Sequence, residues 1–279
     1  MKQLIVTADD FGAALAVNEA VEEAHVEGVL TAASLMVAAP AAADAVARAR
    51  RLPKLKVGLH LVLVEGAPAS DPAAIPDLVG PGGRLRTDLA ALGADIFFKP
   101  HVRAQLEREI LAQFQAYAAT GLPLDHVNTH KHYHLHPTVL SAILRIGPRF
   151  GLEAMRAPVE PRAVLARAEP GGEGAPAWAT APWAALGRRR IRRAGLRAAD
   201  QVFGLRWSGA MTAQRLCGLV RWLPTGLSEV YLHPAKAAGW PGSAPGYGYL
   251  EEFRALTDPA VAAAVRAGGV GLGGYADFA

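Results

Sequence analysis

The first part of the chain alternates between short apolar runs and segments with helical spacing. Leu4–Thr7 is an apolar, β-branched run, and Val17–Glu27 follows it with apolar residues three and four positions apart. The pattern recurs with a strand-like run at Ala32–Ala38 and a helix-forming stretch at Ala41–Arg51, and Leu55–Val64 is a third apolar run. Strands that alternate with helices pair in parallel through crossover connections, so the pattern predicts an α/β fold.

The alternation continues after a Pro/Gly-rich loop at 66–83. We expect the longest helix at Val102–Thr120, another helix at Pro137–Phe150, and further strands at His126–His130, Leu152–Arg156, Ser228–His233 and Gly269–Gly273. A chain of 279 residues, half of them apolar, suits one barrel domain. We therefore predict a single domain over 1–279 with a deformed or incomplete (β/α) TIM-like barrel. Residues 161–209, which interrupt the alternation with a Gly-rich and a basic stretch, are predicted to be an insertion.

Composition adds few constraints. Cys217 is the only cysteine, so we expect neither an intrachain disulfide nor a thiolate cluster, and a metal would need His and carboxylate ligands. The opening apolar run is too short for a signal-peptide core, and no stretch reaches the ~20 apolar residues of a membrane span. The net charge is a modest +4 and the basic residues cluster only briefly. We therefore expect a cytoplasmic protein that does not bind nucleic acid.

Two neighbouring carboxylates, Asp9 and Asp10, follow the first apolar run. In a parallel barrel the carboxyl ends of the strands form the active-site face, so both side chains are candidates for chemistry. Where a strand turns into a loop, neighbouring side chains can reach one site, one as a metal ligand and one as a base. The alternative is that one of them caps the following helix.

Histidines supply the remaining candidate ligands. Five of the nine histidines fall within His126–His136, and neutral imidazole is a common ligand of Zn²⁺ and related ions. An extended run of this length would cover roughly 33 Å, so at most one or two of the five can bind one ion. The others would line the pocket, orient ligands or begin the next helix. His60 lies inside an apolar run, and the alternative to a ligand is a packed core histidine. His233 ends another apolar run, and the alternative there is a loop histidine.

Four ordered motifs resemble the YdjC-like carbohydrate deacetylases. They are Ala8-Asp9-Asp10-Phe11-Gly12, Gly58-Leu59-His60-Leu61, Asn128-Thr129-His130-Lys131-His132 and His233-Pro234, and they span nearly the whole chain. The resemblance implies a deformed α/β barrel and a hydrolase that removes an N-acetyl group with the help of a divalent metal.

The same resemblance assigns roles to individual residues. The implied metal ligands are Asp10, His60 and His130. Asp9 would be the general base and His233 the general acid or electrostatic stabiliser. Arg156, in Met155-Arg156-Ala157-Pro158, matches a further family position and would steer Asp9 or the substrate.

The chain also departs from the family pattern. Asn128 replaces the usual Asp and Lys131 replaces a His. Residues 126–137, with 32–37 and 57–63, look most like the hopanoid-biosynthesis-associated branch. That branch implies removal of acetyl from an N-acetylglucosaminyl group on a bacteriohopanepolyol; soluble sugars such as chitooligosaccharides are the alternative substrates.

The implied chemistry needs a metal because an unactivated amide requires both a strong nucleophile and stabilisation of the developing oxyanion. A divalent metal supplies both, Asp9 can take the proton of the water, and protonated His233 can give one to the leaving amine. Ligation by two His and one Asp accepts Zn²⁺ or Mg²⁺, and leaves Mn²⁺, Co²⁺ and Ni²⁺ open.

The stretch Trp178–Arg197 is strongly basic and contains apolar residues as well. Its arginines are Arg188, Arg189, Arg190, Arg192, Arg193 and Arg197, beside Trp178, Trp183 and Leu186. Such a composition suits a helix at an anionic membrane surface, which a lipid-linked substrate would require, and it predicts peripheral contact with the inner membrane surface. An ordinary helix that packs its apolar side on the barrel is an equal alternative.

Two other functions compete with deacetylation. Another metallohydrolase, such as a phosphoesterase, would be expected to have a second metal or an anion-binding loop. A non-catalytic lipid- or sugar-binding module would explain the basic stretch but would give Asp9 and His233 no task. Both a monomer and a homodimer are compatible with the sequence.

Overall fold

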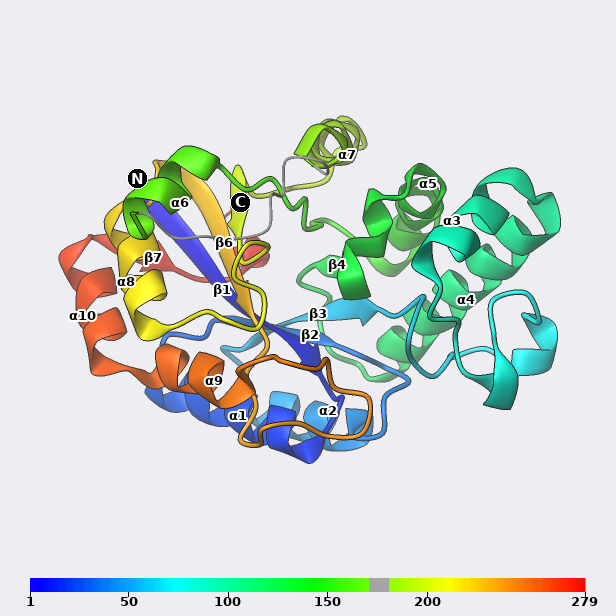
Figure 1. Ribbon diagram of the computed structural model, residues 1–279, viewed down its shortest axis with the longest axis horizontal. Coiled ribbons are helices and arrows are strands. Elements are labelled where there is room, and N and C mark those ends of the chain that lie inside the picture. Colours follow the sequence, from blue (N-terminus) through cyan, green and yellow to red (C-terminus); the bar gives the residue numbers. More distant parts are fainter. Residues whose placement is uncertain (171–180, 279) are drawn as a thin grey trace.

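The computed structural model describes residues 1–170 and 181–278. Within these ranges seven strands form one parallel sheet in the order β4-β3-β2-β1-β6-β5, and β7 pairs with β1. The strands are β1 (Lys2–Phe11), β2 (Ala32–Leu35), β3 (Lys56–Leu61), β4 (Val127–Thr129), β5 (Gln201–Phe203), β6 (Gly226–Leu232) and β7 (Val270–Leu272). The sheet curls into an incomplete TIM-like barrel, which confirms the predicted α/β class (Figure 1).

Helices surround the sheet (Figure 1). They are α1 (Leu15–Glu27), α2 (Ala42–Arg51), α3 (Leu89–Phe98), α4 (Pro100–Ala119), α5 (Pro137–Ile146), α6 (Arg162–Ala168), α7 (Ala181–Arg193), α8 (Ala213–Arg221), α9 (Tyr249–Thr257) and α10 (Pro259–Ala267). Among the helices of the described ranges α4 is the longest, as predicted. The sequence analysis named no helix at the positions of α3, α6, α8, α9 and α10. Of these, α3 lies between a Pro/Gly-rich loop and the Pro that begins α4.

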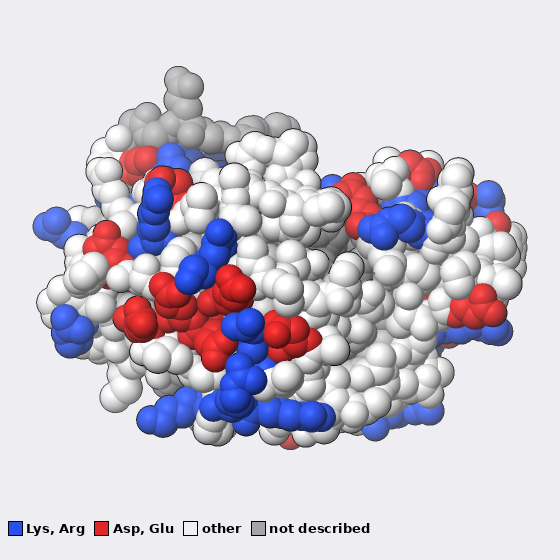
Figure 2. Space-filling model, turned by 90° about the horizontal axis from the view of Figure 1, so that it is seen from below, with Lys and Arg blue, Asp and Glu red and all other residues white. Residues whose placement is uncertain are grey.

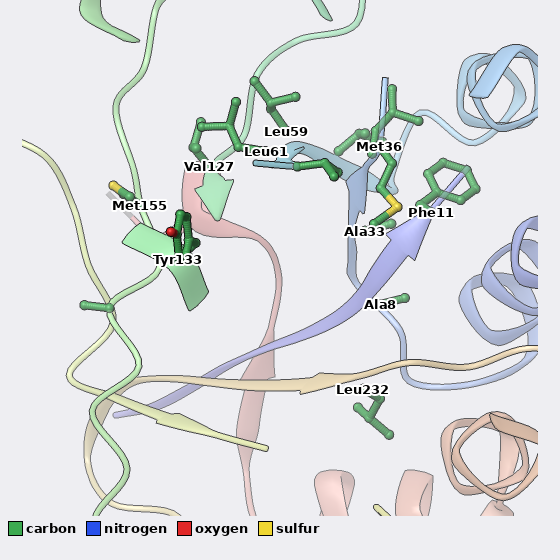
Figure 3. Packing of buried hydrophobic residues seen from close by; sticks show 14 of the residues in the cluster. Ala8, Phe11, Ala33, Met36, Leu59, Leu61, Val127, Tyr133, Met155 and Leu232 are labelled. Atoms are coloured by element: carbon green, nitrogen blue, oxygen red, sulfur yellow. The ribbon is translucent and has the colours of Figure 1, made fainter. Parts of the chain in front are cut away.

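Alternate residues of β1 face different parts of the core. Leu4, Val6 and Ala8 belong to the large hydrophobic cluster that includes residues of the surrounding helices. Ile5 belongs to a second, smaller cluster with Val202 of β5 and Tyr231 of β6. Figure 3 shows side chains of the large cluster on neighbouring strands, from Ala8 through Ala33 and Leu59 to Val127. By the period of two along a strand, Thr7 and Asp9 share the side of Ile5.

The sheet stays open between β4 and β5, where only single bridges form. The predicted strand at Leu152–Arg156 is wrong in extent, because only Ala154 and Met155 form bridges, to Arg197 and Val127. The following Pro158 has no N–H to continue a ladder. The backbone N–H of Val202 then donates to the carbonyl of Val159 at 2.9 Å. Arg156 therefore starts from a connecting segment that runs along the open side of the sheet.

The range 161–209, predicted to be an insertion, contains α6, α7 and β5, and β5 pairs with β6. Part of this range is therefore a strand of the sheet. Trp178 lies in the range 171–180, outside the described residues. In α7, Ala184 and Ile191 are buried, whereas Trp183 is 56% and Leu186 45% exposed. Within the described ranges, no helix combines the length and the apolar character that crossing a membrane demands.

The face of the molecule around α1, α2 and α9 carries charges of both signs. Figure 2 shows acidic and basic side chains lying side by side there. Arg48 of α2 pairs with Glu22 of α1, and Lys236 pairs with Glu23 at 2.6 Å. Within each of these pairs the opposite charges offset each other.

Candidate metal centre and active site

A bulge near the end of β1 presents Asp9 and Asp10 to the same space. Ala8 pairs with Ala33 and Phe11 with Leu35, so one extra residue of β1 lies between these two register points. Asp10 has a φ of 62°, the left-handed conformation that Asp adopts more easily than most residues. Bulges re-aim side chains and are frequent beside active sites. The two carboxylates thus lie within the last residues of β1. The sequence analysis had placed them directly after the strand.

Asp10, His60 and His130 converge on one point. The Oδ1 atom of Asp10 is 3.3 Å from His60 Nε2 and 3.3 Å from His130 Nδ1, and the two nitrogens are 3.4 Å apart. Ligand atoms arranged tetrahedrally about 2.05 Å from one ion would be about 3.3 Å from each other. Asp10 Oδ1 is buried and accepts no hydrogen bond from any described residue. Since a buried carboxylate oxygen needs a partner, these residues fit a divalent cation.

The turn after β4 separates His130 from the other histidines of the cluster. Residues His130–Leu135 form a 3₁₀ turn in which Lys131 and His132 have φ values of 54° and 52°. Left-handed residues of this kind cost strain and are common at functional sites. His132 instead lies 2.9 Å from the Tyr231 hydroxyl, and His134 lies 2.7 Å from the Thr129 hydroxyl. This agrees with the expectation that at most one or two of the five can reach one ion.

Asn128 joins the cluster of Asp10, His60 and His130 to Asp9. Its Oδ1 is 2.7 Å from His60 Nδ1, and its Nδ2 donates to Asp9 Oδ1 at 2.9 Å. Because Asp9 accepts from the amide nitrogen, the amide oxygen faces His60, which must then donate from Nδ1. His60 Nε2 is left with its lone pair toward the cluster, as a metal ligand requires. An ionised Asp at position 128 could not donate to Asp9.

Arg156 lies between two buried carboxylates. Its guanidinium donates to both oxygens of Asp9, with Nη2 2.9 Å from Oδ1, and it reaches Glu229 Oε1 at 2.8 Å. Arg156 and Glu229 are both 0% exposed. Burial would raise the pKa of the Asp9 carboxyl, but the charge of Arg156 and its hydrogen bonds hold that pKa well below its usual range. Asp9 is therefore ionised throughout the physiological pH range.

His233 lies at the end of β6, next to Glu252 of α9. Its Nδ1 is 3.8 Å from Glu252 Oε2, too long for a hydrogen bond, while its backbone N–H donates to the same carboxylate. Burial would lower the pKa of His233, but the attraction of Glu252, with the charges of Asp10 and Asp9, raises it to about 9. At neutral pH the imidazole is thus protonated and can give a proton.

These side chains line a cleft of about 650 Å³. Asp9, Asp10, His60, His130 and His233 all contribute to its surface. On the side of β2 the lining is apolar, with Met36, Ala38, Ala39 and Pro40. After β6, the loop before α9 contributes Trp240 and Tyr247, and α9 contributes its first residue, Tyr249. A concave, largely apolar site with a few convergent polar groups is the usual form of a small-molecule site.

Four residues of the site, Ser34, Asn128, Glu229 and Glu252, had no role assigned from the sequence. Of the four, Glu229 has the clearest signal in the sequence, because a charged residue within the apolar run Ser228–His233 indicates a buried partner. Ser34 and Glu252 carry no such indication, since a serine in a strand and a glutamate in a helix are ordinary.

The fold and the cluster define a class: an α/β half-barrel with a candidate Asp-His-His metal site at the carboxyl ends of its strands. Residues 3–267 match the model of a family described as YdjC-like protein, and the chain belongs to this family.

Similar proteins agree with this assignment. The chain is 31% identical over 278 residues to a carbohydrate deacetylase from Geobacillus stearothermophilus, covering 98% of this chain and 97% of that protein. It is 41% identical to a carbohydrate deacetylase from Brevibacillus brevis, but over 148 residues, about half of each chain (53% and 56%). The crystal structure of a proposed cellobiose-phosphate cleavage protein from Enterococcus faecalis V583 superposes with a TM-score of 0.78 at 23% identity, covering 100% of this chain and 99% of that one. That structure supports the fold alone.

Proposed function

We propose that this chain is a divalent-metal-dependent carbohydrate N-deacetylase, which hydrolyses an N-acetyl group to acetate and a free amine. The observation that carries the proposal is the convergence of Asp10, His60 and His130 on one point, beside Asp9, in a cleft. Membership of the YdjC-like family and the names of the relatives support the same activity.

The chain's own residues divide the work. Asp10, His60 and His130 would hold the ion, which would activate water for attack and polarise the acetyl carbonyl. Asp9, held by Arg156, accepts the proton of the attacking water. His233 gives a proton to the nitrogen as the C–N bond breaks. Arg156 is a positioning residue because both of its partners are buried carboxylates.

Released acetate is the direct test of this function. The purified protein, freed of metal and reloaded with Zn²⁺ or Mg²⁺, is incubated with N-acetylglucosamine, with chitooligosaccharides and with an N-acetylglucosaminyl lipid. We expect acetate from at least one of them and none from the metal-free protein. Phosphate release from phosphate esters without acetate release would favour a phosphoesterase, and binding without turnover would favour a non-catalytic module.

The raised pKa of His233 predicts an alkaline limit to activity. Because the protonated form gives the proton, kcat should fall as the pH rises through about 9. The same protonation stabilises the fold; this contribution is complete below the ordinary value of 6.5 and is lost as the pH rises through about 9. In Glu252→Gln the alkaline fall of kcat should move to lower pH by roughly 1–3 units, because the negative charge that raises the pKa of His233 is removed. An unchanged limb would show that Glu252 does not control the acid.

For the substrate, we propose an N-acetylglucosaminyl group on a hopanoid lipid. The motif resemblance suggested this branch, and the apolar wall at Met36, Ala38, Ala39 and Pro40 suits contact with a lipid portion. Soluble N-acetylated sugars remain the alternative, for which the aromatic side chains Trp240, Tyr247 and Tyr249 offer stacking surfaces. Comparison of kcat/KM for the lipid and for a chitooligosaccharide decides between them.

A lipid substrate would require access to a membrane surface, and we propose α7 as the contact. Its outward face carries exposed Trp183 and Leu186 together with exposed Arg189 and Arg193, whereas Ala184 and Ile191 pack inward. Arg188, by contrast, donates to the backbone carbonyl of Asp200. An apolar pair flanked by cations is suited to an anionic bilayer surface.

The double variant Arg189→Gln/Arg193→Gln tests this contact. Near an anionic surface each cation contributes about 1 kcal/mol, so affinity for phosphatidylcholine vesicles that contain phosphatidylglycerol should fall roughly 30-fold in a sedimentation assay. Arg108→Gln/Arg266→Gln removes the same charge from exposed positions on α4 and α10 and should bind like the unmodified protein. Equal losses in both variants would indicate a non-specific charge effect, and no loss would remove α7 as a contact.

A further inference from the structure

His126, a member of the histidine cluster with no role in the proposed reaction, lies in a buried chain of hydrogen bonds. Its Nδ1 is 2.9 Å from Asp125 Oδ2, and its Nε2 is 3.0 Å from Ser34 Oγ. His126 and Ser34 are both 0% exposed. Asp, His and Ser in this order are the groups that serine hydrolases use to activate a nucleophile.

The burial of Ser34 argues against a nucleophile. Substrate in the cleft cannot reach an oxygen with no exposed surface, and the Oγ atom already has three neighbours. It accepts from Asn128 Nδ2 at 2.8 Å and donates its one hydrogen to Asp9 Oδ1 at 3.2 Å. The bond of 3.0 Å to His126 Nε2 is therefore donated by the imidazole, whose Nδ1–H is given to Asp125. The Asp-His-Ser chain thus points at the carboxylate of Asp9, away from any substrate carbonyl.

The far end of the chain is fixed by the C-terminal turn. The carboxylate of Asp125 accepts the backbone N–H groups of Tyr275 at 3.2 Å and Ala276 at 2.9 Å. Burial would raise the pKa of Asp125, but His126 and these two N–H groups lower it, so Asp125 is an anionic acceptor for His126 Nδ1–H. A hydrogen-bonded imidazole with a fixed partner on one nitrogen has a fixed ring orientation.

The two oxygens of Asp9 have different surroundings. Within the described part of the chain Oδ1 accepts from Ser34, Asn128 and Arg156 Nη2, whereas Oδ2 accepts from Arg156 Nη1. A carboxylate oxygen with three donors has no free lone pair, so the oxygen available to a water molecule is Oδ2.

We propose that Ser34 and His126 are positioning residues that keep Oδ1 of Asp9 occupied and turn Oδ2 toward the reacting water. The inference rests on the proposed function for its catalytic consequence, but the hydrogen-bond chain itself belongs to the folded protein with or without a metal. His126 acts through Ser34, and Ser34 acts through Asp9.

A kinetic double-mutant cycle tests the order of action. With saturating metal, Ser34→Ala and His126→Leu should each lower kcat about 10- to 100-fold, the usual effect of losing an outer partner of a site, with KM and metal content unchanged. The double variant should lose no more than Ser34→Ala alone, and His126→Gln, which keeps a donor, should recover part of the loss. Additive losses, or losses in metal content instead of kcat, would overturn the proposal.

A second measurement is independent of activity. In the metal-free protein, the ¹⁵N resonance of His126 Nε2 should shift in Ser34→Ala and also in Asp9→Asn, because both changes alter the chain. In the Ser34→Ala background, Asp9→Asn should have no further effect, and Ser141→Ala, on the exposed side of α5, should have none at all. If Asp9→Asn as a single substitution leaves the His126 resonance unchanged, the hydrogen bonds from Asp125 to Asp9 do not form a connected chain. If the protein releases no acetate at all, the proposed function fails. The resonance of His126 still shows whether the hydrogen-bond chain exists.

Discussion

Replacement of Asp9 by asparagine should lower kcat for acetate release about 10²- to 10⁴-fold, the usual contribution of a general base. Asparagine has the same shape and can still accept hydrogen bonds from Ser34 and Arg156, but it cannot take the proton of the attacking water. The three metal ligands are untouched, so metal analysis should give the same ion content as in the unmodified protein. Full activity in pure Asp9→Asn would exclude Asp9 as the base.

A matched variant separates the loss of a base from the loss of an ion pair. Glu229→Gln also removes one carboxylate charge next to Arg156. Arg156 Nη2 donates to both Glu229 and Asp9, and Glu229 is fully buried. Both variants leave a buried guanidinium with one charged partner, so both should be less stable to urea. Only Asp9→Asn removes the proton acceptor. A loss of kcat as large in Glu229→Gln as in Asp9→Asn would mean that the ion pair, not the base, limits turnover.

Replacement of His60 by alanine should weaken metal binding by more than about 100-fold, which exceeds the effect usually seen for outer partners of a metal site. His60 contributes one of three converging ligand atoms, and its loss leaves Asp10 and His130, an incomplete set for a divalent ion. Competition with a chromophoric chelator measures the affinity, and activity should fall in parallel.

His101→Ala provides the control for this variant. His101 lies on α4 with its side chain 65% exposed, 3.7 Å from Asp77, and is remote in sequence from every proposed ligand. Its removal changes the number of histidines without touching the cluster, so metal affinity should be unchanged. If His60→Ala bound the ion as tightly as this control, the three-residue site would be wrong.

The elements that the sequence predicted well are those with strong local periodicity. α1, α2 and α4 begin and end within two residues of their predicted bounds, because apolar residues recur along them at helical spacing. The segment at Leu152–Arg156 was misjudged for the same reason: its composition is typical of a strand, but pairing depends on neighbours elsewhere in the chain. Only two single bridges form there.

The candidate site was predictable as far as short motifs could locate it. The order of four motifs indicated Asp10, His60 and His130, and the structure brings these three together. The partners that organise them could not be found in this way. Thr7 and Glu229 are hydrogen-bonded across 222 positions, and Ser34 and His126 across 92, so no local spacing connects them. Their meeting depends on which strands become neighbours in the barrel.

For the basic stretch, the two alternatives considered from the sequence each describe part of α7. Ile191 packs inward, as in an ordinary surface helix, while Trp183 and Leu186 face outward with arginines around them. Composition could not assign the apolar residues to one face or the other, because Trp183, Leu186 and Ile191 lie on more than one side of the helix.

The extra residue at the end of β1 has a mechanical consequence. Asp9 and Asp10 are consecutive, so their Cα atoms are held about 3.8 Å apart by the peptide bond between them. When a base and a metal ligand come from two different elements, their separation depends on how those elements pack against each other. Here bonded geometry sets it, so a shift of the cleft walls along the weakly bridged side of the half-barrel would leave the spacing of these two consecutive residues unchanged.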